Sequence, residues 1–490
     1  MKLTQLLKTI KFYHSEKKID DIDVTGIEMD SRQVDNGNVF VCIDGFTVDG
    51  HQFAKMAEQK GACAIIAERP LSLDIPVIIV NDTAKALAQI SNTFYENPSE
   101  KFQLIGITGT NGKTTLTYML DEIFQLDGQK TGLIGTIQMK IINDTYSVKN
   151  TTPDSLFLQK SFHKMVNKDV DTVMMEVSSH ALDLGRVYGT DYDIAVFTNL
   201  TQDHLDYHKN MEDYFRAKSL LFAQMGNRYD QPKFAVINID DPYGKRLVRS
   251  TAYEVLTYGI ENQANVMAKN LSLNPNGTVF DLSTPVGEVH IESSLVGEFS
   301  VYNMLAASSA ALCANVPLKT IQSAFSETKG VPGRFENVNC GQEFGVIVDY
   351  AHTPDSLENV LKTVQSLAKG KTYVVVGCGG DRDKGKRPKM ANVAITHSDK
   401  AIFTSDNPRT EDPDQILQDM VEGLEATNFS VERDRKQAIS QAIQQCQPGD
   451  VVVIAGKGHE TYQEIGKERF DFDDCKVASE MIEKKLKGRS

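Results

Sequence analysis

The chain of 490 residues lacks the features that mark disulfide-bonded, secreted and membrane-spanning proteins. Its seven cysteines are odd in number and scattered, and no Cys-x-x-Cys pair occurs, which argues against a disulfide framework or structural zinc site and favours a reducing compartment. No apolar run approaches the ~20 residues that a membrane-spanning helix needs. Residues 1–18 carry charges throughout and have no signal-peptide core. We therefore expect a soluble, cytoplasmic protein with no membrane span, and a monomer.

Positive charge is also scarce. With 52 lysines and arginines against 66 acidic residues, the net charge is −14, which argues against non-specific nucleic-acid binding. The densest basic cluster comprises Lys384, Lys386, Arg387 and Lys389. In an acidic protein that binds anionic ligands such a cluster is a site candidate, although a basic run is more often a solvated loop. Cys378, beside a glycine loop, has two interpretations, a reactive thiol or, more commonly, a small packing residue.

The length suits about three domains of ~150 residues each. Proline and polar residues at 95–100, and turn-forming residues at 329–334, mark the boundaries. We expect an N-terminal α/β domain over residues 1–100, a central domain over 101–331 and a C-terminal domain over 332–490. The N-terminal strand candidates are Val39–Ile43, Ala64–Ala67 and Val77–Val80.

Near-continuous apolar strands in the central segment predict a mostly parallel sheet covered on both faces. The candidates are Leu104–Ile107, Thr172–Val177, Ile194–Thr198 and Phe234–Ile237, followed by a β-rich insert over Asn265–Val296. In the C-terminal segment, strands at Val346–Val348, Tyr373–Val376, Ala401–Phe403 and Val451–Ile454 each end in a polar, glycine-bearing loop. This pattern predicts a Rossmann-like doubly wound fold, in which ligands bind beyond the strands' carboxyl ends.

The most informative segment joins the first central strand to a helix-like pattern. It reads Gly109-Thr110-Asn111-Gly112-Lys113-Thr114-Thr115. Glycines let backbone N–H groups surround phosphate oxygens, Lys113 supplies a positive charge, and Thr114 offers a hydroxyl to Mg²⁺. The loop is the shorter Gly-x-x-Gly-Lys-Thr, so the alternative is an ordinary glycine turn. In context, we interpret it as a triphosphate site of a P-loop-like ATPase domain.

Two further strand ends carry groups that suit a metal ion. Glu176 ends one strand and His204 follows the next, and with Thr114 they could hold Mg²⁺ against ATP phosphates. Alone, a histidine is more often a packing or hydrogen-bonding residue. For Lys218, in a predicted helix, spacing alone favours a lysine whose stem packs along the helix.

Four segments occur in the order found in the Mur ligases. They are Gly-Thr-Asn-Gly-Lys-Thr at 109–114, Glu-Val-Ser-Ser-His-Ala at 176–181, Asn-Leu-Thr-Gln-Asp-His-Leu-Asp at 199–206 and Ala-Lys-Ser-Leu-Leu-Phe at 217–222. With Asp30-Ser31-Arg32 and Gly456-Lys457-Gly458-His459-Glu460, the resemblance spans essentially the whole chain. It implies an ATP-dependent, amide-bond-forming enzyme of peptidoglycan synthesis, which adds the third residue to UDP-N-acetylmuramoyl-L-alanyl-D-glutamate.

The resemblance also implies residue roles. Lys113, Glu176, His204 and Lys218 would be catalytic, with Lys218 carbamylated by CO₂ so that Thr114, Glu176, His204 and the carbamate hold Mg²⁺. ATP would contact the loop residues 109–115 together with Asn303, Arg334 and His352, while Asp349 would help to position nucleotide or intermediate. Ser300 stands where many relatives have asparagine, which puts any nucleotide contact there in doubt.

The implied substrate sites lie at both ends of the chain. UDP-muramoyl-dipeptide would contact Ser31, Asn150, Thr151, Thr152, Ser178, Arg186 and Lys218. The amino acid would contact Arg382, Asp406, Asn407, Pro408, Arg409, Gly456 and Glu460. The Asp-Asn-Pro-Arg pattern at 406–409 resembles enzymes that take meso-2,6-diaminopimelate, because a guanidinium at 409 can pair with the second carboxylate, which lysine lacks.

Simpler interpretations of these residues stay open. Glu460 could be a surface acid, and residues 406–408 could cap the helix expected near Asp412. The segment Gly330–Gly333 is the hinge candidate for closure of the C-terminal domain on ATP. Folylpolyglutamate synthase, another Mur ligase, or a nucleotide-operated switch are the alternative functions.

Overall fold

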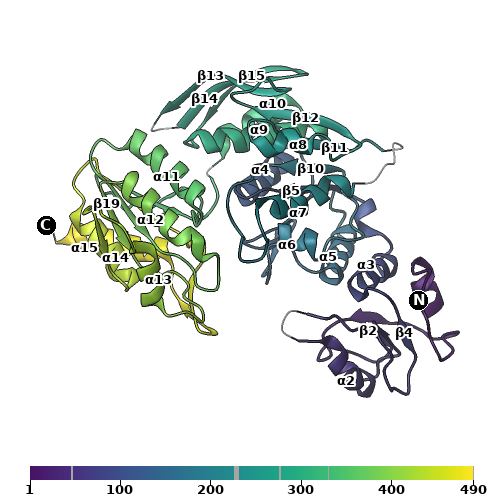
Figure 1. Cartoon of the computed structure of the whole chain (residues 1–490). Coiled ribbons are helices and arrows are strands. Elements are labelled where there is room, and N and C mark those ends of the chain that lie inside the picture. Colours follow the sequence, from purple (N-terminus) through teal and green to yellow (C-terminus); the bar gives the residue numbers. More distant parts are fainter. Residues whose placement is uncertain (46–47, 226–230, 275–276, 329, 489–490) are drawn as a thin grey trace.

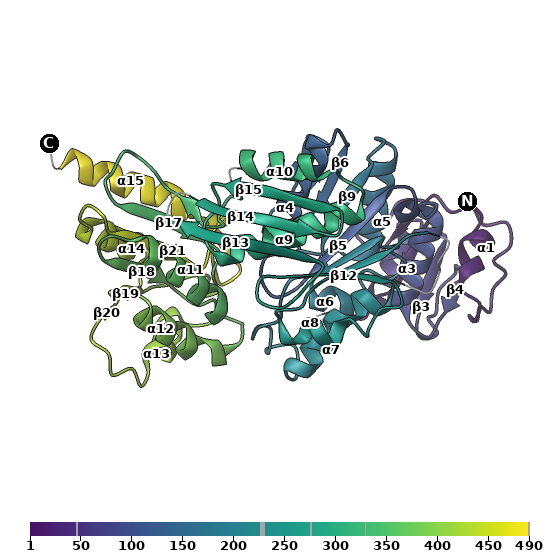
Figure 2. The same cartoon turned by 90° about the horizontal axis from the view of Figure 1, so that it is seen from above.

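The computed structural model describes residues 1–45, 48–225, 231–274, 277–328 and 330–488, so Lys329 of the expected boundary and residues 275–276 of the expected insert lie outside it. Three α/β units follow one another along the chain, with the central unit between the other two (Figures 1 and 2). Each unit has its own mainly parallel sheet, which confirms the predicted fold class. Among the described residues no helix is long and apolar enough to cross a membrane.

The N-terminal unit has a parallel sheet in the order β1-β2-β3-β4, formed within the described residues by Gly26–Glu28, Asn38–Val41, Ala64–Ala67 and Val77–Ile79. Its helices are α1 (Leu3–Leu6), η1 (Leu7–Thr9), η2 (Gly50–Phe53), α2 (Ala54–Gln59), α3 (Thr83–Phe94) and η3 (Pro98–Glu100). Asp82 caps α3 by accepting a hydrogen bond from the Lys85 N–H. Helix α3 also contacts α5 of the central unit, so it joins the two units.

The central sheet runs in the order β15-β14-β13-β12-β11-β10-β5-β9-β6-β7-β8. The strands from β13 to β6 in this order pair in parallel, while β14, β15, β7 and β8 extend the two edges in antiparallel fashion. Their bounds are β5 (Gln103–Thr108), β6 (Thr131–Ile134), β7 (Met139–Ile141), β8 (Asp144–Tyr146), β9 (Thr172–Glu176), β10 (Ile194–Phe197), β11 (Phe234–Asn238), β12 (Glu254–Gly259), β13 (Val266–Asn274), β14 (Gly277–Thr284) and β15 (Gly287–Ser293).

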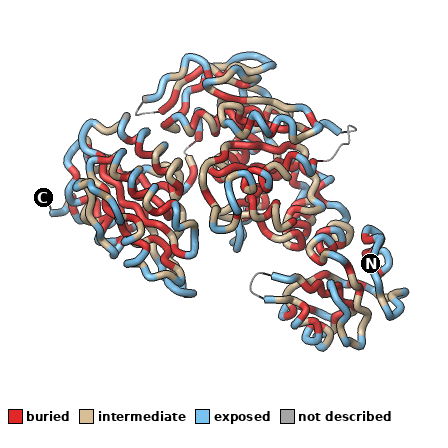
Figure 3. Tube along the Cα trace, in the orientation of Figure 1, coloured by how far each residue is buried: buried red, intermediate tan, exposed pale blue. Residues whose placement is uncertain are grey.

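Two layers of helices cover the parallel part of this sheet. One face packs against α4 (Lys113–Leu126), α9 (Glu298–Cys313) and α10 (Leu318–Glu327). The other packs against α5 (Ser155–Val166), α6 (Ser179–Asp183), α7 (Met211–Ala223) and α8 (Pro242–Leu247). Figure 3 shows the resulting burial, and the continuously apolar strands follow from having a core on both sides.

The C-terminal unit has the sheet order β16-β17-β21-β18-β19-β20, with every pair parallel except β16–β17. Helices α11, α12 and α13 cover one face, and α14 and α15 the other. The strands are β16 (Glu336–Asn337), β17 (Gly345–Asp349), β18 (Thr372–Val376), β19 (Lys400–Phe403), β20 (Phe429–Val431), β21 (Val451–Ala455) and the hairpin β22 (Tyr462–Ile465) and β23 (Glu468–Asp471). The helices are α11 (Pro354–Leu367), η4 (Lys384–Lys386), α12 (Arg387–Thr396), α13 (Pro413–Val421), α14 (Arg435–Gln445) and α15 (Asp474–Lys487).

The strand order decides where the functional residues meet. Strand β5, which leads into the glycine loop, lies between β9, which ends at Glu176, and β10, which leads toward His204. The chain crosses from β6 and β9 on one side of β5 to β10 on the other, which makes this edge a topological switch point. Ligands bind at such points because the loops after neighbouring strands separate there.

Helices α14 and α15 are tied together by a fully buried ion pair. Arg435 donates to both carboxylate oxygens of Asp474, at 2.8 and 2.7 Å, and to the Ala455 carbonyl at 3.0 Å. On the surface of the same two helices, Lys436 pairs with Glu480 at 2.9 Å, with both side chains about half exposed. The two pairs join the same helices but differ in burial.

We expect Asp474→Asn to lower the free energy of unfolding of the C-terminal unit by roughly 3–5 kcal/mol, because it leaves the buried guanidinium without a charged partner. The matched variant Glu480→Gln is expected to change it by less than about 1 kcal/mol, since exposed pairs contribute little. Urea unfolding followed by circular dichroism compares the two. Equal effects would contradict this account.

Candidate active site

The glycine loop between β5 and α4 needs glycine for two physical reasons. Gly109 and Gly112 have φ angles of +153° and +87°, which disfavour side chains. A Cβ atom would lie 1.8 Å from Thr198 Oγ1 at position 109 and 2.6 Å from Asn303 Oδ1 at position 112. The loop backbone is therefore pressed between β10 and α9, and its N–H groups lie at the N-terminus of α4, where an anion is favoured.

Two lysine amines converge on this loop. Lys113 Nζ donates to the carbonyls of Gly109 and Thr110 at 2.9 and 2.8 Å, and Lys218 Nζ donates to the same Gly109 carbonyl at 2.8 Å. Lys218 is only 1% exposed and lies over the Tyr214 ring. Burial, helped by the nearby Lys113 charge, holds the pKa of Lys218 well below its usual value. Its amine is thus biased toward the neutral, nucleophilic form.

Glu176 is buried at the end of β9, and its carboxylate is held by one residue. Oε1 accepts from the Thr136 N–H at 2.8 Å, and Oε2 accepts from the Thr136 hydroxyl at 3.0 Å. The charges of Glu176 and Asp203 act to raise the pKa of Lys113, but desolvation is the larger effect and lowers that pKa. Both carboxylate oxygens of Glu176 are therefore oriented by Thr136, near Lys113.

The expected dipeptide-binding segments meet beside Glu176. Thr152 donates its hydroxyl hydrogen to the Glu176 carbonyl at 2.8 Å, and accepts from the Ser178 N–H at 3.0 Å. Arg186 donates to the Thr152 carbonyl at 3.3 Å. Thr151 lies 3.1 Å from Thr136 through their hydroxyls, whereas Asn150 is exposed at the rim. Four of these five residues therefore surround the end of β9.

His204 follows β10 in a left-handed conformation, with φ of +55°, that a neighbouring carboxylate stabilises. Asp203 Oδ1 accepts from the His204 N–H at 2.9 Å, and its Oδ2 lies 3.4 Å from His204 Nε2. Desolvation lowers the pKa of His204 to about 3, so this imidazole is neutral near pH 7 and able to bind a metal. Burial opposes charge on Asp203, but its neighbours, among them the permanent cation Lys386, outweigh this effect and hold the pKa of Asp203 well below its usual range.

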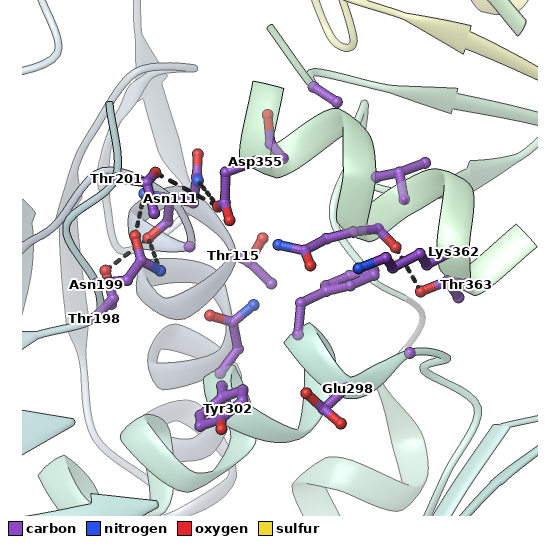
Figure 4. A pocket seen from close by; sticks show the side chains of 18 of the residues that line it. Asn111, Thr115, Thr198, Asn199, Thr201, Glu298, Tyr302, Asp355, Lys362 and Thr363 are labelled. Carbon is purple, nitrogen blue, oxygen red and sulfur yellow. Dashed lines mark hydrogen bonds between the residues drawn. The ribbon is translucent and has the colours of Figure 1, made fainter. Parts of the chain in front are cut away.

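A cavity of about 640 Å³ opens beside the glycine loop, between the central and C-terminal units (Figure 4). Of the expected ATP contacts, Asn111, Gly112, Thr115, Asn303 and Arg334 line it, whereas Gly109, Thr110, Lys113, Thr114 and His352 lie outside its lining. In Figure 4, Asp355 of α11 reaches across to Asn111, where the bond is 2.9 Å, and to Thr201. One wall therefore belongs to each unit, as a nucleotide site between domains requires.

Arg334 also spans the two units. Its Nη2 donates to Thr114 Oγ1 at 3.1 Å, and its guanidinium lies over the Tyr350 ring. The loop after β21 packs against this pair, since a Cβ on Gly333 would lie 2.0 Å from the His459 nitrogen, and Tyr350 stacks near His459 at 5.2 Å. The loop that carries Glu460 is thus adjacent to the nucleotide cavity.

Asn407 is the centre of the expected amino-acid site. Its amide donates to Glu460 Oε2 at 2.8 Å and accepts from Lys457 Nζ at 3.0 Å. Lys457 is fully buried and also donates to Glu460 at 3.0 Å. Glu460 therefore belongs to a bonded network, not to a free surface. Asp412, not residues 406–408, caps α13 by accepting from the Asp414 N–H.

Arg409 lies beside this network, in a left-handed conformation with φ of +50°. Its Nε donates to Glu464 at 3.2 Å and its Nη1 to the Gly380 carbonyl at 2.8 Å. Arg382 is exposed, and both arginines lie within 4 Å of where a Cβ on Gly379 would be. Gly456, with φ of +114°, lets the backbone approach Asp406, while Pro408 accepts from the Glu411 N–H. The expected residues of this site therefore share one edge of the sheet.

Three comparisons with known proteins agree with this geometry. The Mur ligase family, catalytic domain matches residues 23–95, the Mur ligase middle domain matches 107–311, and the Mur ligase, glutamate ligase domain matches 333–458. A UDP-N-acetylmuramoyl-L-alanyl-D-glutamate–2,6-diaminopimelate ligase from Bacillus velezensis is 58% identical over 98% of this chain and 99% of its own length. The chain belongs to the Mur ligase family.

Two further relatives support the membership. The ligase of the same name from Bacillus licheniformis is 56% identical over 98% of this chain and 99% of its own length. A solved structure with that name has a TM-score of 0.69 at 34% identity and covers 96% of this chain and 97% of its own. As a Mur ligase, the chain is an ATP-dependent enzyme that forms amide bonds.

Some expected Mur ligase residues lie apart from this junction. Ser31, after β1, is buried in the N-terminal unit and donates to the Met56 sulfur at 3.5 Å. Ser300 donates to the Val296 carbonyl at 2.8 Å and is not among the residues lining the cavity, so its hydroxyl serves the start of α9. Burial raises the pKa of the Cys378 thiol to about 12, which favours the packing interpretation of this residue.

Sequence reasoning missed several polar residues of the Mur ligase site. They are Thr136, Thr198, Asn199, Gln202, Asp203 and Asp355. Asn199, Gln202 and Asp203 lie within the quoted segment 199–206, in which only His204 was given a role. Thr136, Thr198 and Asp355 carry no spacing signal, since their contacts arise from the packing of separate loops.

The donor set fits Mg²⁺ only in part. Among the described residues no cluster of three His, Cys, Asp or Glu side chains is arranged to hold a metal ion. Thr114 and Glu176 offer oxygen donors and His204 a neutral nitrogen, and a carbamate on Lys218 would add the anionic oxygens that Mg²⁺ prefers. ATP phosphates would supply the rest.

We expect Gly112→Ala to abolish measurable ATP binding, because the added methyl would displace Asn303 and deform the loop. Gly128→Ala is a matched control, since Gly128 has nearly the same φ of +86° but open space around its Cβ position. Both variants incur backbone strain of about 1–2 kcal/mol, and thermal unfolding measures this loss of stability. Calorimetric titration with ATP then measures the difference in ATP affinity between the two variants. Equal ATP affinity in the two variants would refute the close-packing argument.

Proposed function

We propose that the chain joins the γ-carboxylate of the D-glutamyl residue of UDP-N-acetylmuramoyl-L-alanyl-D-glutamate to an amino group of meso-2,6-diaminopimelate, with hydrolysis of ATP to ADP and phosphate. The relatives at 55–58% identity carry this activity in their names. The single structural observation behind the proposal is Arg409, held beside the Asn407–Lys457–Glu460 network. The reaction is a cytoplasmic step of peptidoglycan synthesis, where ATP is supplied.

The chemistry requires activation first. A glutamyl carboxylate oxygen attacks the γ-phosphorus of ATP, the bond to the β-phosphate oxygen breaks, and ADP leaves. The amine of diaminopimelate then attacks the acyl-phosphate carbonyl, inorganic phosphate leaves, and the amine nitrogen loses a proton. Phosphorylation is needed because a carboxylate is anionic and oxide is a poor leaving group. The enzyme's contribution is orientation and charge neutralisation.

Residues of the central unit carry the charge neutralisation. Lys113 and the loop N–H groups would hold the phosphates, and Arg334 of the C-terminal unit, which donates to Thr114, would add a second positive charge there. Thr114, Glu176, His204 and a carbamate on Lys218 would hold Mg²⁺, which supplies Lewis-acid stabilisation of phosphoryl oxygens when bound. Asn303 and the cavity residues would hold the adenosine end.

Residues of the loops around Thr152 would receive the acceptor acid. Ser178 and Arg186 lie beside Glu176, and a guanidinium suits the carboxylates of the dipeptide. Ser31 would contact the uridine-diphosphate end in the N-terminal unit. The three units would then each supply one substrate contact region, with Gly330–Gly333, where both glycines have positive φ, as the hinge.

Lys218 is suited to carbamylation for a physical reason. Its neutral nitrogen would attack the carbon of CO₂, form an N–C bond and release one proton. A protonated amine has no lone pair for this step, and burial with the Lys113 charge keeps Lys218 biased toward the neutral form. The product places an anion beside the Lys113 amine, where a neutral amine stood before.

Arg409 would select diaminopimelate over lysine. Its described contacts use Nε and Nη1, which leaves Nη2 for a substrate carboxylate. Lysine has hydrogen where diaminopimelate has this second carboxylate, so it would leave the guanidinium unpaired in a half-buried site. Asn407 and Glu460 would meet the amine and the other carboxylate through donor and acceptor groups.

The proposal is tested by ADP and tripeptide formation with UDP-muramoyl-dipeptide plus diaminopimelate or lysine. We expect wild type to prefer diaminopimelate by at least ~100-fold in kcat/KM, and Arg409→Ala to reduce this preference at least ~10-fold, as loss of one charged hydrogen-bonded contact predicts. Arg433→Ala removes an exposed arginine of the same unit that pairs with Asp414 on the surface, and should retain wild-type selectivity.

Two results would count against these assignments separately. ATP hydrolysis that ignores the acceptor amine would contradict the ligase reaction and favour a nucleotide-operated switch. Equal use of lysine and diaminopimelate by wild type would contradict only the proposed role of Arg409 and would leave the ligase reaction standing.

The carbamate has an independent signature. We expect protein equilibrated with ¹³C-bicarbonate to show a carbamate carbon resonance that is absent from Lys218→Ala. That variant should lose at least ~1000-fold in kcat, and short carboxylic acids should restore part of it by supplying an anionic oxygen near Glu176. An identical ¹³C spectrum in both proteins would show that Lys218 is unmodified.

A further inference from the structure

The basic cluster at residues 384–389 is not used by the reaction described above, yet only part of it faces solvent. Lys384 is exposed and pairs with Glu411 of its own unit at 3.1 Å. Arg387 is buried and pairs with Glu411 and Asp419, again within the C-terminal unit. Lys386 and Lys389 instead point to the central unit. The cluster therefore divides into a part that braces its own fold and a part that crosses between units.

Lys386 makes the most buried of these crossing contacts. Its ammonium lies 3.6 Å from Asp203 Oδ1, and each of the two side chains is only 6% exposed. His352, also from the C-terminal unit, lies 3.7 Å from Asp203 Oδ2. Asp203 thus faces an ammonium and an imidazole from two separate loops of the other unit. A buried carboxylate with one permanent cationic partner depends strongly on that partner.

The residue before Asp203 makes two further contacts with the same segment. Gln202 Nε2 donates to Asp383 Oδ2 at 3.3 Å, and Gln202 Oε1 accepts from the Lys389 ammonium. Asp383 caps η4, Lys386 ends it and Lys389 lies in the first turn of α12, so one short helical stretch meets one loop. The helical stretch presents an acid and two lysines to an amide and a carboxylate of the loop, and this complementarity favours one alignment of the two surfaces.

The loop 202–204 links these contacts between the units to the reaction site. Asp203 bonds the backbone N–H of His204 and approaches its imidazole, and His204 holds a left-handed backbone conformation that a non-glycine residue adopts at a cost. A carboxylate that must bind both His204 and Lys386 transmits the position of one to the other. No other residue of the cluster reaches the loop at such depth among the described contacts.

We propose that Lys386 is a positioning residue, which docks the C-terminal unit onto the loop 202–204 through Asp203 and thereby holds His204 in its working conformation. Residues Gln202, Asp383 and Lys389 set the register of this latch. The functional consequence rests on the proposed ligase reaction, whereas the docking itself does not. Docking places the loops of Asn407 and Arg409 beside the nucleotide cavity, where the amine would attack the phosphorylated carboxylate.

The test uses the full chain with donor and acceptor dyes attached through non-natural amino acids at the exposed positions 169 and 425, one in each unit. Single-molecule energy transfer then measures the ratio of docked to undocked molecules without any substrate. Lys386→Met keeps the length of the side chain and removes its charge. Lys386→Arg keeps the charge, and Lys384→Met removes a charge from the same segment without crossing the interface.

We expect Lys386→Met to lower the docked-to-undocked ratio at least ~10-fold, because it leaves Asp203 buried without its permanent cation. Lys386→Arg should keep most of the docking, and Lys384→Met should match wild type. In turnover, Lys386→Met should lose at least ~10-fold in kcat with KM for ATP changed less than ~3-fold, because ATP is held mainly by the central unit. Unchanged thermal unfolding would show that each unit remains folded.

Wild-type energy transfer in Lys386→Met, or an equal loss in Lys384→Met, would overturn the latch. Failure of the ligase reaction gives a different pattern, since no tripeptide would form while the charge-dependent docking would persist. A kcat loss without any change in docking would assign Lys386 to the chemistry and contradict its role as a positioning residue.

Discussion

The parallel pairing of β5 with β9 on one side and β10 on the other is the constraint on which the active site depends. Because all three strands point the same way, the glycine loop, Glu176 and the loop before His204 end at one edge of the sheet. Gly109 can approach Thr198 only because it has no side chain, and this close approach fixes the loop. A strand order that separated β9 or β10 from β5 would leave the same residues without a shared site.

Desolvation lowers the pKa of the lysine amines at this edge of the central sheet. Lys113 and Lys218 donate to the same backbone carbonyl, and the surrounding protein lowers the pKa of both amines. A bound triphosphate, a carbamate on Lys218 or both would place negative charge beside these desolvated amines. Two buried lysines of the C-terminal unit hold carboxylates, since Lys386 pairs with Asp203 of the central unit and Lys457 pairs with Glu460 of its own unit. Buried charge in this protein therefore favours bound ligand and docked domains.

The alternation of apolar strands and helices was readable in advance because continuous apolar runs require cover on both faces, and β5, β9, β10, β11, β17, β18, β19 and β21 all lie where expected. Strands β8 and β23 were not predicted, since all of their residues are exposed and carry no apolar pattern. At the candidate site, Lys113, Glu176, His204 and Lys218 were proposed from ordered motifs. Thr136 and Asp355 were not predicted, because hydrogen bonds between distant loops produce no periodic pattern in the sequence.

The sequence by itself determined the α/β class, the glycine loop and the set of chemical groups, because local patterning and residue type carry that information. Only the tertiary structure decided which groups share an environment. It buried Lys386 against Asp203 while leaving Lys384, two residues earlier, in solvent. It also held Arg409 with Glu464 in a left-handed conformation. Burial and partner identity arise from packing between segments far apart in the chain, which no local spacing encodes.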